Sequence, residues 1–157
     1  MKYNYHKIFL DIAEKIAEMS NCVSHKVGAI LVKDKRIIST GYNGTPHNFL
    51  NCNDINNNLN MSVPADREKH HEFSEMFEIH AECNVMLCAA KNGININGSI
   101  LYTTLHPCND CLKMICNSGI KTVIYRYEYD KFKNNFDIAE MLSMTGVNLI
   151  HESKLKP

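Results

Sequence analysis

The sequence predicts an α/β fold, a three-layer α/β/α sandwich in which a mixed sheet of about five strands lies between two layers of helices. Three observations lead to this prediction. Two apolar runs in the first half of the chain are separated by only a few turn residues, which is typical of a β-hairpin. In the second half, strand-length runs alternate with helix-length segments, which favours parallel strands with right-handed connections. The 157 residues suit one domain with its own core.

The first half of the chain supplies one helix and the hairpin. Apolar residues recur at helical spacing in residues 7–19, so this segment is predicted to be an amphipathic helix that packs on the core. Residues 27–32 form a continuous apolar run of strand length. Residues 33–35 make a tight turn, and residues 36–42 return as the second strand. A turn-rich loop, Tyr42-Asn43-Gly44-Thr45-Pro46, comes next.

The middle of the chain is low in complexity. Residues 51–60 contain six Asn, a composition typical of a surface segment outside the core. We therefore predict a single domain over residues 1–157 with an Asn-rich insertion at about residues 47–66. Residues 66–78 are charged and rich in His, and they lead into the next helix.

The remaining part of the chain is predicted to contain three helices and three strands. A buried helix begins near His80 and is ended by Asn92 and Gly93. The elements after it are a strand at 99–105, a helix at 108–118, a strand at 121–127, a helix at 136–144 and a last strand at 147–150. Gly119 and Gly146 end the two later helices.

Composition narrows the classes of partner. Lys and Arg together number 17, as do Asp and Glu, so the formal net charge is zero and no nucleic-acid partner is expected. No apolar run approaches the roughly 18 residues of a membrane span, and there is no charged-then-apolar leader, so we expect no membrane partner. Seven Cys, an odd number with several at metal-ligand spacing, favour a reducing cytoplasm over a disulfide framework. We therefore expect a cytoplasmic protein, in the host cytoplasm if it is encoded by a virus.

One His and two Cys have a spacing that indicates a metal site. His80-Ala81-Glu82 is followed by Pro107-Cys108-Asn109-Asp110-Cys111, in which Cys108 comes 28 residues after the His. His80, Cys108 and Cys111 are good zinc ligands, and a site with three protein ligands keeps a fourth position open for water. Both segments begin predicted helices, whose positive ends stabilise thiolates. Glu82 lies where such a water needs a base.

The alternatives for this cluster are a closed zinc knot and a redox Cys-x-x-Cys. A knot needs a fourth ligand, and Glu82 is better suited to act as a base than as a ligand. The full pattern of His-x-Glu with Pro-Cys-x-x-Cys is the signature of zinc nucleobase deaminases, and it is far more specific than Cys-x-x-Cys alone. We therefore interpret the cluster as a catalytic zinc site.

Further motifs resemble the deoxycytidylate (dCMP) deaminase family of the cytidine deaminase-like superfamily, and its bacteriophage members in particular. The resemblance covers nearly the whole chain, and its most family-specific part is the Gly-Tyr-Asn-Gly-x-Pro loop at residues 41–46. It also includes Val27-Gly28-Ala29, residues 36–40, Glu78-Ile79-His80-Ala81-Glu82 and Ser118-Gly119-Ile120-Lys121. Asn109 departs from the Pro usual in the family, which leaves the ligands unchanged.

The resemblance implies a zinc hydrolase that converts dCMP to dUMP and ammonia, within the pyrimidine deoxyribonucleotide metabolism that supplies thymidylate synthesis. Glu82 would be the catalytic acid and base, with zinc activating the attacking water. The backbone of Ala81 would hold the pyrimidine O2, and Asn43 would orient the sugar. Further candidate contacts, to the phosphate or at the pocket entrance, are Ser24, Lys26, Tyr125 and Tyr129.

The resemblance also implies a homohexamer that dCTP activates and dTTP inhibits, each effector bound with Mg²⁺. The candidate effector contacts are Lys91, Gly41, Tyr42 and Gly44. A second, structural zinc ion with four protein ligands in a closed site is implied as well. Its ligands would be Cys22, Cys52, His70 and Glu78, with His71 as the alternative to His70.

The sequence leaves other activities open. They are a bifunctional deaminase of dCMP and dCTP, a free cytidine deaminase, a tRNA adenosine deaminase, and a zinc module without activity. The zero net charge argues against tRNA. The Asn43 loop argues for a nucleotide, and Glu82 argues against an inactive module. Because dCMP and dCTP share base and sugar, the sequence does not separate these two substrates.

Overall fold

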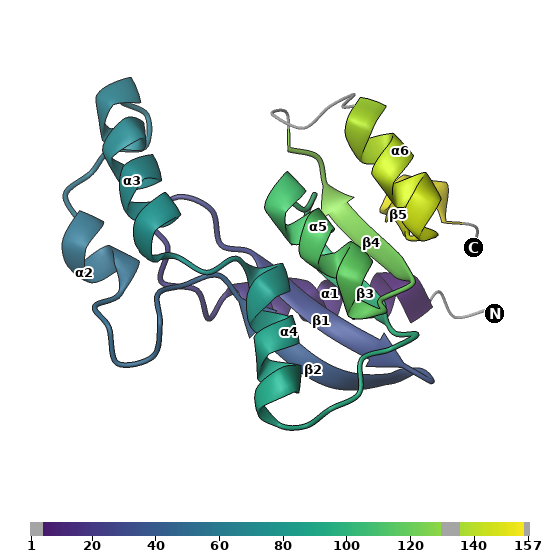
Figure 1. Ribbon diagram of the computed structural model, residues 1–157. Helices are drawn as coiled ribbons and strands as arrows, with labels where there is room; N and C mark the ends of the chain where they lie inside the picture. The colour runs from purple at the N-terminus through teal and green to yellow at the C-terminus, as the bar shows by residue number, and fades with distance from the viewer. Residues whose placement is uncertain (1–4, 130–135, 156–157) are drawn as a thin grey trace.

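A five-stranded sheet forms the centre of the computed structural model, which describes residues 5–129 and 136–155 (Figure 1). Its strands are β1 (Gly28–Lys33), β2 (Arg36–Tyr42), β3 (Ile100–Leu105), β4 (Thr122–Tyr127) and β5 (Asn148–His151). They lie in the order β2-β1-β3-β4-β5. β1 pairs antiparallel with β2 and with β3, whereas β3, β4 and β5 are parallel, which confirms the predicted mixed sheet.

Helices cover both faces of this sheet (Figure 1). One face is covered by α1 (Tyr5–Ala17). The other face is covered by α4 (Ala81–Lys91), α5 (Asn109–Ser118) and α6 (Phe136–Thr145). The three-layer α/β/α arrangement predicted from the sequence is therefore confirmed.

Two hydrophobic clusters correspond to the two helical layers. The cluster under α1 contains Leu10 together with Ile30 of β1. The larger cluster, under α4, α5 and α6, contains Leu31 of β1 together with Val85 and Leu112. Because consecutive residues of a strand point to opposite faces, a continuous apolar run such as β1 can serve both layers.

Two helices approach the hairpin so closely that only Gly fits beneath them. A Cβ atom at Gly28 would lie 2.1 Å from the Ala13 carbonyl oxygen of α1. A Cβ atom at Gly41 would lie 2.4 Å from the Val85 backbone nitrogen of α4. Gly41 therefore determines how near α4, which begins directly after His80, lies to β2.

The Asn-rich insertion and the charged segment after it contain two helices that the sequence analysis did not predict. α2 (Cys52–Asn56) is short, and α3 (Pro64–Phe77) begins with Pro, which is well suited to the first helical position. Both lie beside the sheet and not over its faces (Figure 1). α3 buries only His70 and Phe73, so it lacks the apolar stripe from which a helix is predicted.

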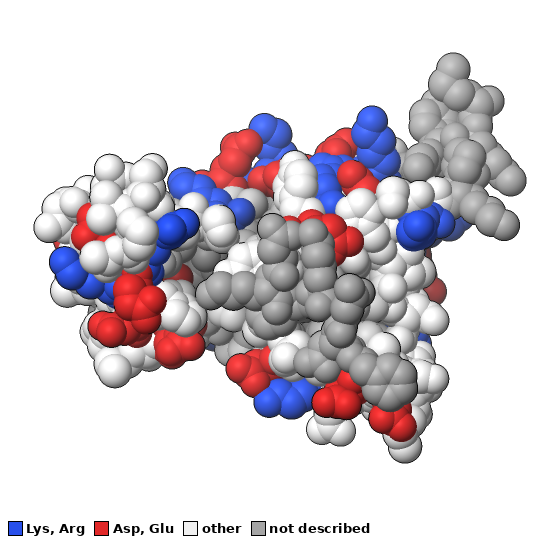
Figure 2. All heavy atoms as spheres, turned by 90° about the horizontal axis from the view of Figure 1, so that it is seen from above, with Lys and Arg blue, Asp and Glu red and all other residues white. Residues whose placement is uncertain are grey.

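Charged side chains of both signs are intermingled on the face shown in Figure 2, outside the grey residues. This distribution agrees with the formal net charge of zero. Within residues 5–129 and 136–155, no helix is long and apolar enough to cross a bilayer.

Candidate metal centre and active site

The three residues of the metal motif come together where α4 and α5 begin. His80 is the N-cap residue of α4, Cys108 is that of α5, and Cys111 lies in the first turn of α5. The Nδ1 atom of His80 lies 3.3 Å from Cys108 Sγ and 3.5 Å from Cys111 Sγ. α5 follows β3, the central strand of the sheet, along the chain. The end of β3 therefore places both cysteines next to the start of α4.

The protonation of this cluster suits a metal cation. A hydrogen bond from the Cys111 thiol lowers the pKa of Cys108, and the contact with Cys108 raises the pKa of His80 to about 9. The pKa of Cys111 is raised, first because its thiol donates to Cys108 and then because it is buried. Without a metal, these shifts favour a thiolate at Cys108 beside a protonated His80. A divalent cation bound by all three side chains favours two thiolates and a neutral imidazole, with release of protons.

Glu82 lies beside this cluster in the first turn of α4, and it is only 4% exposed. Its Oε2 atom lies 3.7 Å from Cys111 Sγ, and its Oε1 atom accepts a hydrogen bond from the Thr103 hydroxyl of β3 at 3.5 Å. Burial raises the pKa of Glu82. A carboxyl with a raised pKa can both accept and donate a proton near neutral pH. The sequence analysis missed Thr103. The feature that could have indicated its role is a polar hydroxyl in an otherwise largely apolar strand.

A second cluster, the tetrad, consists of Cys22, Cys52, His70 and Glu78. His70 Nε2 lies 3.4 Å from the sulfur of Cys22 and 3.4 Å from that of Cys52. Glu78 Oε2 lies 3.6 Å from Cys22 Sγ. All four donor atoms lie within 4.8 Å of one another. The structure thus brings together residues from the loop after α1, from α2, from the middle of α3 and from the C-cap of α3.

The chemistry of the tetrad fits a closed metal site. Tetrahedral zinc, with Zn–S and Zn–N bonds of about 2.3 and 2.0 Å, places sulfur and nitrogen donors about 3.5 Å apart, close to the separations observed. Glu78 Oε1 is buried without a hydrogen-bond partner in the described part of the chain, and a metal ion would satisfy such an oxygen. Burial raises the pKa of Cys22 to about 12 and raises that of Cys52, so a cation is needed to ionise these thiols.

The structure distinguishes the two adjacent histidines of α3. His70 is buried within the tetrad. His71 is exposed instead, and its Nε2 atom lies 3.3 Å from Glu75 Oε1. The geometry therefore favours His70 as the fourth member of the cluster.

Both clusters contribute to the wall of one space of about 1120 Å³, which we term the main cleft. Its wall also includes residues of α3, the loop at residues 22–27 and Ala81 at the start of α4. The volume is sufficient for a small-molecule ligand.

Asn43 lines the main cleft and also holds the loop beside it. Its side chain accepts a hydrogen bond from the Val27 N–H and donates one to the His25 carbonyl, each at 2.8 Å. Its backbone carbonyl accepts one from the Ser20 hydroxyl at 2.8 Å. Asn43 is therefore a buried part of the wall, and its contact with a ligand stays a prediction.

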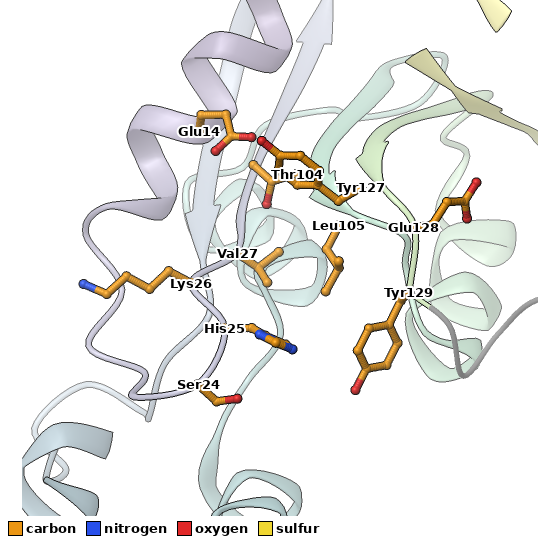
Figure 3. Close-up of a pocket in the computed structure, with 10 residues that line it drawn as sticks. All are labelled: Glu14, Ser24, His25, Lys26, Val27, Thr104, Leu105, Tyr127, Glu128 and Tyr129. Carbon is orange, nitrogen blue, oxygen red and sulfur yellow. The ribbon is translucent and has the colours of Figure 1, made fainter. Parts of the chain in front are cut away.

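Ser24 and Lys26 line a side cavity of about 510 Å³ next to the main cleft (Figure 3). Ser24, His25 and Tyr129 line both spaces, whereas Lys26 lines only the side cavity. In Figure 3 the Lys26 ammonium points away from the side chains of these three residues. This orientation does not favour the predicted contact of Lys26 with a phosphate in the main cleft.

Tyr125 does not close the pocket as the sequence analysis predicted. It is only 7% exposed and lines neither the main cleft nor the side cavity. Its ring packs against His106 and His151, at centroid distances of 4.8 and 5.2 Å, and its hydroxyl donates to Glu128 at 3.0 Å. Tyr125 therefore supports His106, a wall residue of the main cleft that the sequence analysis missed.

The predicted effector contacts lie in different settings. Gly41 is buried against the backbone of α4, so its role is in packing and the prediction that it contacts an effector is corrected. Gly44 exchanges backbone hydrogen bonds of 3.1 and 2.8 Å with Ile79. The Tyr42 carbonyl accepts a hydrogen bond from an α4 side chain at 2.8 Å. Lys91 is exposed at the end of α4.

Comparison with known proteins gives consistent matches. The model of the cytidine and deoxycytidylate deaminase zinc-binding region matches residues 3–127, which include both clusters. The deoxycytidylate deaminase of Enterobacteria phage T2 is 37% identical to this chain, over 93% of it and 91% of the relative. The human deoxycytidylate deaminase is 30% identical, over 88% of this chain and 74% of the relative.

The fold has solved counterparts as well. The crystal structure of the dCMP deaminase of cyanophage S-TIM5 in complex with dCMP and dUMP has a TM-score of 0.73 and 36% sequence identity. The similarity covers 96% of this chain and 98% of that chain. The apo form of the same cyanophage protein has a TM-score of 0.71.

Proposed function

The chain belongs to the cytidine and deoxycytidylate deaminase family, and from this premise we propose that it hydrolyses dCMP to dUMP and ammonia, which supplies dUMP for thymidylate synthesis. The observation that carries the proposal is the buried Glu82 carboxyl beside His80, Cys108 and Cys111 in a ligand-sized cleft. The phage T2 relative is named for this activity, and the S-TIM5 neighbour binds both dCMP and dUMP.

The metal in this proposal is zinc, held by His80 Nδ1 and by the sulfur atoms of Cys108 and Cys111, the donors that lie together in the structure. When bound, zinc supplies the Lewis acidity that makes water a nucleophile near neutral pH. The start of two helices at this site adds a positive potential that favours the thiolates.

Glu82 moves the protons of the reaction. It accepts a proton from the attacking water and delivers it to N3 of the cytosine as oxygen bonds to C4. It then takes the remaining proton from the new C4 hydroxyl and passes it to the amine, which leaves as ammonia while C4 becomes a carbonyl. Its raised pKa suits a group that must change protonation state twice in each turnover. Thr103 restrains the carboxyl through Oε1. The backbone N–H of Ala81, at the start of α4, donates a hydrogen bond to the pyrimidine O2.

A second, structural zinc ion at the tetrad is part of the proposal. Four buried or half-buried ligand groups within 4.8 Å of one another support it, as does the orphaned Oε1 atom of Glu78. The insertion and α3 bury few apolar side chains, so a closed metal site is a means of fixing them to the loop after α1.

A panel of substrates separates this activity from its alternatives. The zinc-loaded protein is incubated with dCMP, dCTP, cytidine and a tRNA anticodon stem-loop, and ammonia release and product formation are measured for each. We expect turnover of dCMP. Comparable turnover of dCTP would identify a bifunctional enzyme, whereas turnover of tRNA alone, or of no substrate, would contradict the proposal.

Gly41→Ala is expected to lower the turnover of dCMP by about 10²-fold, because a displacement of about 1 Å at reacting groups has an effect of this size. The new Cβ atom would lie 2.4 Å from the Val85 nitrogen and 2.8 Å from the Ala81 carbonyl oxygen. α4 must therefore shift, and Glu82 shifts with it. The same overpacking should lower the free energy of unfolding by about 1–3 kcal/mol.

Gly44→Ala is the matched control for this prediction. It lies in the same segment, and a Cβ atom there would meet nothing within 4 Å. Steady-state kinetics and urea unfolding are measured for both variants. Equal behaviour of the two variants would show that the close approach of α4 at Gly41 does not position the site.

The proposal also includes a homohexamer that dCTP activates and dTTP inhibits, with Mg²⁺ bound to the effector. This part is supported by the family resemblance alone, with Lys91, Tyr42 and Gly44 as the remaining candidate contacts. We expect sigmoidal dCMP kinetics that become hyperbolic with dCTP, because the effectors must favour different states of the assembly. A monomer in sedimentation with hyperbolic kinetics indifferent to dTTP would contradict it.

A further inference from the structure

The main cleft is lined by one permanently charged basic side chain among the residues that the structure describes. That side chain is Arg67, which lies one turn into α3. Its guanidinium forms no ion pair with another described residue. Arg67 is exposed, so its donors are available to a ligand.

The acidic side chains that line the main cleft do not neutralise this charge. They are Glu68, Glu75, Glu78, Glu82 and Asp110. Asp110 pairs with Lys113 at 2.6 Å, and Glu75 pairs with His71 at 3.3 Å. Glu78 belongs to the tetrad, and Glu82 lies beside Cys111, one of the candidate zinc ligands. Glu68 alone among these five residues takes part in none of these contacts. It follows Arg67 directly in the sequence, so it points about 100° away from Arg67 around the helix axis.

We propose that Arg67 is a specificity-determining residue that binds the 5′-phosphate of the substrate, so that the enzyme prefers nucleotides to nucleosides. This inference rests on the proposed function, which places the pyrimidine at Ala81 and Glu82 and leaves the phosphate farther out in the same cleft. A guanidinium suits this task because its planar fork binds two phosphate oxygens at once. Lys26, the residue predicted for the phosphate from the sequence, does not line the main cleft.

The tetrad determines where Arg67 lies. His70 follows Arg67 by three residues on α3, and residues at this spacing are neighbours on the helix surface. Glu78 is the C-cap residue of the same helix. α3 is thus held to Cys22 and Cys52 near its middle and at its end. Phosphate recognition and the tetrad are therefore coupled through one helix.

The test compares Arg67→Ala and Lys26→Ala with the unaltered protein, all with circular dichroism and zinc content verified. Kinetics are measured with dCMP and deoxycytidine, and binding of dUMP and deoxyuridine is measured by calorimetry. We expect Arg67→Ala to lower kcat/KM for dCMP by about 10- to 100-fold, mainly through KM, the effect of losing hydrogen bonds to a charged group. The affinity for dUMP should fall by a similar factor, while deoxycytidine and deoxyuridine are unaffected.

Two further variants sharpen the comparison. Arg67→Lys keeps the charge without the planar fork, so it should lower kcat/KM for dCMP and the affinity for dUMP less than Arg67→Ala does. Lys69→Ala, on the same helix and paired with Asp66 at 3.7 Å, should leave nucleotide and nucleoside values unchanged. Equal effects of Arg67→Ala on dUMP and deoxyuridine, or a selective loss of dUMP binding in Lys26→Ala instead, would overturn the inference. Absence of deamination by the unaltered protein would overturn the proposed function, while dUMP binding still decides the role of Arg67.

Discussion

Replacing Glu82 with Gln is expected to reduce the turnover of dCMP by at least about 10²–10⁴-fold, the range that general acid–base catalysis contributes. The amide keeps the shape of the side chain and an acceptor for the Thr103 hydroxyl, but it cannot take up and release a proton. The variant should still fold and bind zinc at His80, Cys108 and Cys111, because Glu82 is not one of the three donors.

Glu68→Gln is the matched control, since it makes the same chemical change in an exposed side chain that lines the same cleft. Its turnover should equal that of the unaltered protein. Zinc content is determined by mass spectrometry on the samples used for kinetics. Near-normal turnover by Glu82→Gln would refute its role in proton transfer, and loss of zinc from that variant would show that Glu82 is a ligand.

Cys52→Ala is expected to remove one of two zinc ions per chain and to lower the free energy of unfolding by about 2–4 kcal/mol, since loss of a structural metal ranks among the large single-site effects. For a chain of this size that corresponds to a fall of about 4–16 °C in the melting temperature. The reason is that Cys52 Sγ lies 3.4 Å from His70 Nε2 in the tetrad, and the insertion has little apolar surface of its own.

Cys88→Ala controls for the loss of a thiol, because Cys88 is exposed on α4 and belongs to neither cluster. It should keep two zinc ions and the original melting temperature. Limited proteolysis adds a local measurement, and cleavage in Cys52→Ala should begin near residues 51–66. A metal-replete protein that binds one zinc ion per chain, with Cys52→Ala unchanged, would exclude the second site.

The grouping of Glu82 with the three candidate zinc ligands could be predicted because these residues fall in two short motifs, each at the start of a helix. His80 and Glu82 are two positions apart, and Cys108 and Cys111 are three positions apart, so their proximity depends on local geometry and one pairing of helices. The tetrad has no such local pattern. Cys22 and Glu78 are 56 residues apart and meet only through the tertiary fold, so family resemblance was needed to group them.

The features that the sequence analysis missed depend on tertiary contacts. α3 buries two side chains and is positioned by the tetrad, so its hydrophobic periodicity is weak. The position of Gly41 in a family-specific loop suggests an effector contact. In the structure its lack of a side chain instead allows the close approach of α4. The strand pattern around Tyr125 fits a side chain at the pocket as well as one in the core. Only the packing of its ring on His106, seen in the structure, distinguishes these two positions.

The central claim, that this chain deaminates dCMP by addition of water at C4, is tested most directly by one measurement. The zinc-loaded protein is incubated with dCMP in ¹⁸O-labelled water, and the product is analysed by mass spectrometry. The account predicts dUMP that carries one ¹⁸O atom on the base, with ammonia released in equal amount. Recovery of unchanged dCMP, or of dUMP without the label, would contradict it.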